Sequence, residues 1–257
     1  MIPPYIDAHI HADVRSFEDF GKMAQAGIEK AVTCAHDVYR MSTKEVYLDH
    51  YDRLLRTETK RAREAGLELF VALGVHPEAI PRDVDHLIEE LPNVLDNEYV
   101  VAIGETGLDE STEKEIGVLK AQMELSIKKD LPIIVHTPTK GKKEALQEIL
   151  RLIETTMIDP FKVLVDHLNT ETVPMVIDSG VYMGLSIQPP SKIDRNEAAS
   201  IIEGHGSSRF MISSDMSSKK SDPLALPRTA LELEKRGVSK DWIKKVCHDN
   251  AASFYNI

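Results

Sequence analysis

The sequence has 257 residues, a formal net charge of −11, 42% hydrophobic residues and 28% charged residues. This composition is typical of a water-soluble globular protein and excludes a largely disordered chain. The negative charge disfavours general adhesion to duplex nucleic acid, because that binding depends on neutralising phosphates. A local basic site remains compatible with it.

The sequence predicts neither a membrane segment nor a disulfide framework. No apolar run approaches the roughly 18 residues of a transmembrane helix, and the first residues do not resemble a secretion signal. The two cysteines, Cys34 and Cys247, lie in apolar runs and are expected to be reduced core residues. We therefore expect a cytoplasmic protein with no membrane partner, while the oligomeric state stays open.

Short apolar runs alternate with helix-patterned stretches along the chain, as in repeated βα units. Helix start signals occur at Ser16 and Ser239, and stop signals at Gly66 and Gly237. The longest helical stretch, residues 42–65, is heavily charged and predicts a solvated helix face. The eight predicted strands are residues 5–9, 30–36, 68–75, 99–105, 132–137, 162–167, 181–187 and 209–215.

Eight βα units in about 250 residues predict a single (β/α)8 TIM barrel, and we expect residues 1–257 to form one domain. A doubly wound open sheet is the alternative. In a barrel of this type, the active site lies where the strands end and their following loops begin. Polar residues at those positions are therefore candidate site residues.

Side chains that bind metals or transfer protons lie at or just beyond the ends of seven of the eight predicted strands. They are His9 with His11, His36 with Asp37, His76, Glu105 with Asp109, His136, Asp166 with His167, and Asp215. Each alone is readily explained as a helix cap or a loop contact, but their convergence on one rim predicts a metal site. Imidazoles and carboxylates without thiolates suit Zn, Mn, Ni or Fe, with ligands enough for two ions. The remaining histidines fall in helices or their flanks and are expected to be surface or structural residues: His50, His86, His205 and His248.

The order of these motifs resembles the TatD family of metal-dependent hydrolases, within the amidohydrolase superfamily. The motifs are His9-x-His11, Gly74-Val-His-Pro77, Gly104-Glu-Thr-Gly-Leu-Asp109, Val135-His136, His167, Ser214-Asp215 and Asn250-Ala-Ala-Ser-Phe254. The resemblance covers roughly residues 5 to 255. It implies a (β/α)8 barrel that performs hydrolysis.

The resemblance also implies a role for each site residue. His9, His11 and Asp215 would hold one divalent ion, His136 and His167 a second, and Glu105 would bridge the two. The two ions are expected to be Zn, Mn, Ni or Mg. Asp215 is the candidate base for the attacking water, and Glu105 is catalytic through the metals. His76 and Asp109 would touch substrate or support the ligands.

Several members of this family are deoxyribonucleases, so cleavage of phosphodiester bonds is the expected reaction. The segments His167-Leu-Asn-Thr170 and Ser213-Ser-Asp-Met-Ser217 depart from the pattern of the nuclease-like members. The metal ligands are kept in both segments, whereas the changed loop residues would contact the substrate. A lactonase or amidase on the same barrel, or an inactive metal-binding scaffold protein, are the alternatives.

Basic residues after predicted strands 5, 7 and 8 favour a phosphate-containing substrate. They are Lys140, Lys142, Lys143, Lys192, Arg195, Lys219 and Lys220, and all are expected to rim the site. Lys140 is the expected substrate contact. Lysines are common in surface loops, so a chance distribution is the competing explanation. Under the phosphate interpretation, single-stranded or terminal DNA fits better than long duplexes, because the rest of the protein is acidic.

Overall fold

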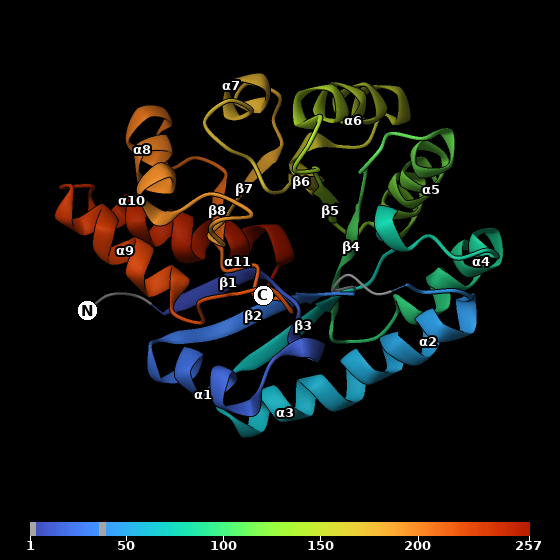
Figure 1. Ribbon diagram of the computed structural model, residues 1–257, viewed down its shortest axis with the longest axis horizontal. Helices are drawn as coiled ribbons and strands as arrows, with labels where there is room; N and C mark the ends of the chain where they lie inside the picture. Colours follow the sequence, from blue (N-terminus) through green and yellow to red (C-terminus); the bar gives the residue numbers. More distant parts are fainter. Residues whose placement is uncertain (1–3, 36–39) are drawn as a thin grey trace.

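The computed structural model describes residues 4–35 and 40–257. Eight parallel strands form one sheet in sequence order, surrounded by helices (Figure 1). The strands are β1 Tyr5–Ile10, β2 Ile28–Cys34, β3 Glu68–Ala72, β4 Val100–Gly107, β5 Ile133–His136, β6 Val163–Val165, β7 Tyr182–Ser186 and β8 Phe210–Ser213. Just beyond β8, the Asp215 amide donates to the His9 carbonyl at 3.0 Å, and the His11 amide donates to the Met216 carbonyl at 2.7 Å. These bonds join the last strand to the first, so the TIM-barrel prediction is confirmed and the open-sheet alternative is wrong.

The helices follow the strands in a βα repeat. They are α1 Phe17–Gln25, α2 Lys44–Asp52, α3 Thr59–Glu64, α4 Val84–Val94, α5 Glu113–Lys129, α6 Lys142–Thr156, α7 Val173–Val176, α8 Arg195–His205, α9 Ala225–Lys235, α10 Lys240–Lys244 and α11 Asn250–Tyr255, with short turns η1 Ala12–Val14, η3 Pro77–Ala79 and η4 Pro160–Lys162. The π-helical turns η2 Arg53–Glu58 and η5 Lys245–Asp249 join α2 to α3 and α10 to α11. Ser16 caps α1 and Ser239 caps α10, each accepting a backbone N–H with its hydroxyl, as the sequence predicts.

Several strands are shorter at their carboxyl ends than the sequence predicts. Strand β6 ends at Val165 rather than residue 167, and β8 ends at Ser213 rather than residue 215. His167 and Asp215 have φ values of 61° and 46°, in the left-handed region that a regular strand does not use. The chain therefore leaves the sheet at these two side chains. The predicted end of strand 2, with His36 and Asp37, lies outside the described residues.

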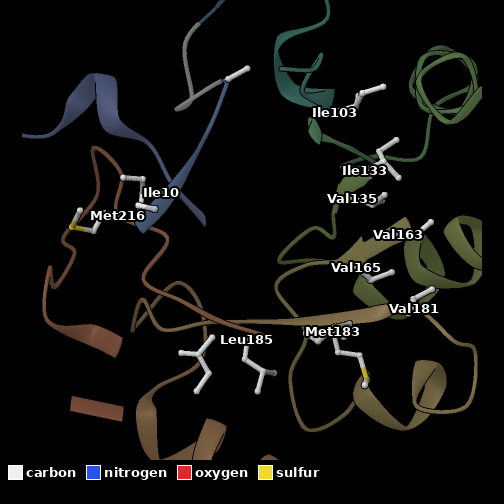
Figure 2. Close-up of a cluster of buried hydrophobic side chains, with 14 of the residues drawn as sticks. Ile10, Ile103, Ile133, Val135, Val163, Val165, Val181, Met183, Leu185 and Met216 are labelled. Carbon is white, nitrogen blue, oxygen red and sulfur yellow. The ribbon is translucent and has the colours of Figure 1, made fainter. Parts of the chain in front are cut away.

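The alternation along β5 separates the outer core from the barrel interior. Ile133 and Val135 belong to the larger hydrophobic cluster, together with outward residues of β6 and β7 (Figure 2). Ile134 belongs to the smaller cluster inside the barrel. His136 has the same parity as Ile134 and so lies on the interior side of its strand.

Helix α11 closes the amino-terminal end of the barrel. Phe254 and Tyr255 join the interior cluster, and the Tyr255 hydroxyl donates to the Ala8 carbonyl at 2.8 Å. Cys34 and Cys247 are buried free thiols, as expected. Among the described residues, every helix is too short or too polar to cross a bilayer. With one end of the barrel filled, the polar residues gather at the other.

Candidate metal centre

Residues from β1, β4, β5 and the segments after β6 and β8 meet at the carboxyl-terminal end of the barrel. The six predicted ligands that the structure brings together are His9, His11, Glu105, His136, His167 and Asp215. The Nε2 atoms of His9 and His11 are 3.2 Å apart. His9 lies on β1 and His11 directly follows it in extended backbone, so the two side chains, two positions apart, share one face.

Glu105 lies at the middle of the cluster and divides its two oxygens between different histidines. Oε1 is 2.9 Å from His136 Nδ1 and 2.7 Å from His167 Nε2. Oε2 is 3.4 Å from His9 Nε2 and 3.8 Å from His11 Nε2. Burial raises the pKa of Glu105, but His9, His167 and His136 outweigh it and hold that pKa well below the usual range. Glu105 is therefore an ionised carboxylate with histidines on both sides.

Asp215 faces the first histidine pair from the end of β8. Its Oδ1 is 3.5 Å from His11 Nε2, and its Oδ2 is 2.8 Å from Lys192 Nζ. Burial raises the pKa of Asp215, but Lys192 and the neighbouring histidines lower it well below the ordinary value. The carboxylate is thus ionised although its side chain is only 4% exposed.

The cluster forms the floor of a cavity of about 380 Å³. His76 and Asp109 both line this cavity, and so does Lys140. His76 Nε2 also lies 3.9 Å from Glu105 Oε2, near enough for His76 to count among the candidate ligands. The loop that carries Asp109 is fixed by the buried carboxylate of Glu115, which accepts the backbone N–H groups of residues 109, 110 and 111 at 3.0, 3.0 and 2.8 Å.

The profile of the family described as "TatD related DNase" matches residues 6–256. The chain belongs to the TatD family. An uncharacterised metal-dependent hydrolase of Methanocaldococcus jannaschii is 51% identical to this TatD-family chain over 252 residues, which cover 98% of the chain and 100% of that protein. The protein is thus a metal-dependent hydrolase.

Solved structures agree with this assignment. The TatD-like protein of Archaeoglobus fulgidus has a TM-score of 0.85 and 28% identity, covering 98% of this chain and 100% of that one. The phosphotriesterase homology protein of Escherichia coli has a TM-score of 0.71 at 17% identity, covering 99% of each chain, and shows the shared fold alone.

The donor set of this TatD-family chain fits divalent cations. Asp166 Oδ2 is 2.6 Å from His9 Nδ1, so the carboxylate accepts a hydrogen bond from the Nδ1–H group of His9. In this tautomer, the lone pair of His9 is on Nε2, the atom that faces His11. Two imidazole nitrogens and two ionised carboxylates then converge at this point, a combination that could hold a divalent cation. Among the described residues, the candidate ligand atoms are nitrogen and oxygen, which suits Zn, Mn or Ni.

Asp166 contacts two candidate ligands, which the sequence analysis does not predict. Its Oδ1 accepts the backbone N–H of His167 at 2.7 Å and the Ser186 hydroxyl at 3.1 Å, so one carboxylate orients two candidate ligands. A Cβ atom on Gly184 would lie 2.1 Å from Asp166 Oδ1, so only glycine leaves room for that carboxylate. The adjacent pair Asp166-His167 at a strand end was the available signal.

The prediction that all the basic loop residues rim the site is wrong in part. Lys140, Lys192 and Lys219 line the cavity. Lys142 points inward and donates to the His167 carbonyl at 2.6 Å and the Thr137 hydroxyl at 2.9 Å. Lys143 pairs with Glu171 at 2.9 Å, while Arg195 and Lys220 are not among the lining residues. Lys142 thus buries its charge to satisfy carbonyl and hydroxyl oxygens that the loops leave free.

The histidines expected to be structural lie on helices or in a helical turn, and His50 interacts electrostatically with His11. His86 and His205 are exposed on α4 and α8, and His248 lies beside Asp249 in η5. His50, on α2, is largely buried, and this burial lowers its pKa to about 4. None of the four belongs to a candidate metal group among the described residues.

Proposed function

We propose that this metal-dependent hydrolase cleaves phosphodiester bonds with two divalent ions held at the barrel end. His9, His11 and Asp215 would hold one ion, His136 and His167 the other, and Glu105 would bridge them. The division of the Glu105 oxygens between two histidine pairs supports this arrangement. Bound ions would lower the pKa of a water molecule toward neutrality and polarise the scissile group.

The side chains around the cluster would orient the substrate and the water. Asp215 is the candidate base, and its Oδ1 atom, which faces the histidine pair, would accept the proton of the attacking water. His76 and Asp109, on the cavity wall, are placed to contact the leaving group or a phosphate substituent. Asp166 accepts the hydrogen bond of the His9 Nδ1–H group, which would leave His9 Nε2 free to bind the ion.

Two cavity lysines that have no carboxylate partner among the described residues support the phosphodiester assignment. Lys140 and Lys219 line the cavity, and neither ammonium forms an ion pair within residues 4–35 and 40–257. In a protein of net charge −11, two unpaired ammonium groups at the metal cluster favour an anionic substrate. The acidic remainder of the surface repels long duplexes, so single-stranded or terminal DNA and small phosphodiesters are the proposed substrates. The two reduced cysteines fit action in the cytoplasm.

A substrate panel tests the reaction class. The protein is loaded with Zn, Mn, Ni or Mg and assayed on phosphodiesters, phosphomonoesters, lactones and amides. We expect turnover of phosphodiesters. Turnover confined to lactones or amides would overturn the proposal in favour of the broader amidohydrolase chemistry, and full metal content with no turnover would indicate a metal-binding scaffold.

The lysines are tested separately with Lys140→Gln and Lys219→Gln. Each variant should raise KM for a phosphodiester and make KM less dependent on salt, because one charge contact is lost. Lys143→Gln is the matched control, since Lys143 pairs with Glu171 outside the cavity. An unchanged KM with an unchanged salt dependence in both cavity variants would show that these lysines do not meet substrate phosphate.

A further inference from the structure

Lys192 forms a buried ion pair with a candidate metal ligand. It lies between β7 and α8, and its Nζ atom is 2.8 Å from Asp215 Oδ2. The side chains of Lys192 and Asp215 are 14% and 4% exposed, respectively. Charges so shielded from water interact much more strongly than an exposed surface pair. The contact therefore restricts how the Asp215 carboxylate is oriented.

The two oxygens of Asp215 have different partners. Oδ1 faces the histidine pair, 3.5 Å from His11 Nε2 and 3.9 Å from His9 Nε2. Oδ2 faces Lys192. A carboxylate that is free to rotate would present both oxygens to a cation placed between those histidines. The ammonium group prevents this by occupying one of them.

The loop that carries Lys192 is fixed to the segment that carries Asp215. The buried side-chain amide of Gln188 donates to the Asp215 carbonyl and, at 2.8 Å, to the Ser217 hydroxyl. The carbonyl oxygen of the same side chain accepts the Ser191 hydroxyl at 2.8 Å, and the backbone carbonyl of Gln188 accepts the Lys192 amide at 2.9 Å. Gln188 thus sets the position of Lys192 relative to Asp215.

An ammonium group beside a metal ligand repels the metal, so metal retention alone gives no reason for Lys192 to be there. We propose that Lys192 is a positioning residue for Asp215. Its ammonium binds Oδ2 and leaves Oδ1 alone to coordinate the divalent ion held with His9 and His11. This inference concerns the metal centre and holds whichever ester or amide is the substrate.

The test compares Lys192→Met, which removes the charge at similar length, with Lys192→Arg, which retains it. Lys129→Met is the matched control, because Lys129 forms a similarly close pair with Asp96, 2.7 Å away on another part of the surface. Each purified protein is loaded with Co²⁺, and its visible absorption spectrum and Co²⁺ affinity are recorded. Co²⁺ absorbs less strongly as its coordination number rises, so the spectrum reports one-oxygen or two-oxygen binding by Asp215.

We expect Lys192→Met to weaken the Co²⁺ absorption, because the released Oδ2 joins the coordination sphere. We expect kcat on an active substrate to fall by about 10- to 100-fold. Lys192→Arg and Lys129→Met should retain the wild-type spectrum. Lys192→Ala is a second neutral variant, and we expect it to weaken the Co²⁺ absorption in the same way. It provides the test if Lys192→Met does not fold.

Two outcomes would overturn the inference. One is a neutral variant that has the wild-type Co²⁺ spectrum, Co²⁺ affinity and kcat. The other is a neutral variant with a wild-type spectrum in which KM alone rises, because Lys192 would then bind substrate and not position Asp215. Loss of the phosphodiester assignment would leave the spectral result untouched.

Discussion

Glu105 has contacts to both halves of the cluster, so its charge should matter more than that of any neighbour. Glu105→Gln keeps the shape of the side chain and removes the negative charge shared by His9, His136 and His167. We expect metal content and turnover to fall together, turnover by at least about 100-fold. Elemental analysis and a turnover assay on the same preparation check this. Glu89→Gln, on the exposed face of α4, is the control, and full activity in Glu105→Gln would disprove the bridging role.

Asp166 should act on metal affinity through His9. In Asp166→Asn, the amide donates to Nδ1, which favours the imidazole tautomer whose proton is on Nε2 and directed into the cluster. We expect metal to bind about 10- to 100-fold more weakly, as measured by competition with a chelator. Asp178→Asn, at an exposed position, should change nothing. Equal affinities for the two variants would mean that Asp166 does not set the His9 tautomer.

At the scale of elements, the long helical segment α2–η2–α3 is tied to the loops of the site. Glu58 is fully buried and binds Arg53 at 3.0 Å and also Arg61. The same arginines donate to the carbonyls of Asp13 and Arg15, just after the ligand His11, at 2.6 and 2.9 Å. A carboxylate in the helix thereby holds the segment that follows β1.

Glu58→Ala should lower the free energy of unfolding by about 2 kcal/mol, because the arginines lose a buried, charged acceptor. Chemical denaturation measures the change. Glu64→Ala is the comparison, since its pair with Lys60 is exposed and 3.8 Å long, and it should cost no more than about 0.5 kcal/mol. Equal losses of unfolding free energy in the two variants would show that Glu58 does not anchor this segment.

The order of elements could be predicted because each strand is a short apolar run and each candidate ligand lies near the carboxyl end of one. Strand ends could not be predicted to the residue, since His167 and Asp215 leave the sheet through left-handed backbone. The direction in which loop side chains point could not be predicted from the sequence either. Lys140 and Lys142 are two residues apart, yet one lines the cavity and the other points into the protein. Nothing in their spacing distinguishes them.

At the scale of the whole molecule, the core and the metal cluster are separate. The larger hydrophobic cluster lies between the strands and the helices, and the smaller one lies inside the barrel toward its amino-terminal end. The candidate ligands lie at the carboxyl-terminal end. Removing metal with a chelator should therefore leave the barrel folded but less stable, by about 2.7 kcal/mol relative to protein with free metal at 100 times its Kd. Calorimetry with and without added Zn or Mn checks this. An identical Tm in the two states, with metal content verified, would contradict it.

The bonds that join β8 to β1 also dictate when the centre can exist during synthesis. Asp7, on β1, accepts the backbone amide of Ser214 at 2.9 Å, across a separation of 207 positions. At about 5 to 20 residues per second, the ribosome makes His9 and His11 some 10 to 40 s before it makes Asp215. During that interval the two histidines are present without Asp215, the carboxylate that follows β8. The nascent chain therefore acquires its full ligand set only after all eight strands have been synthesised.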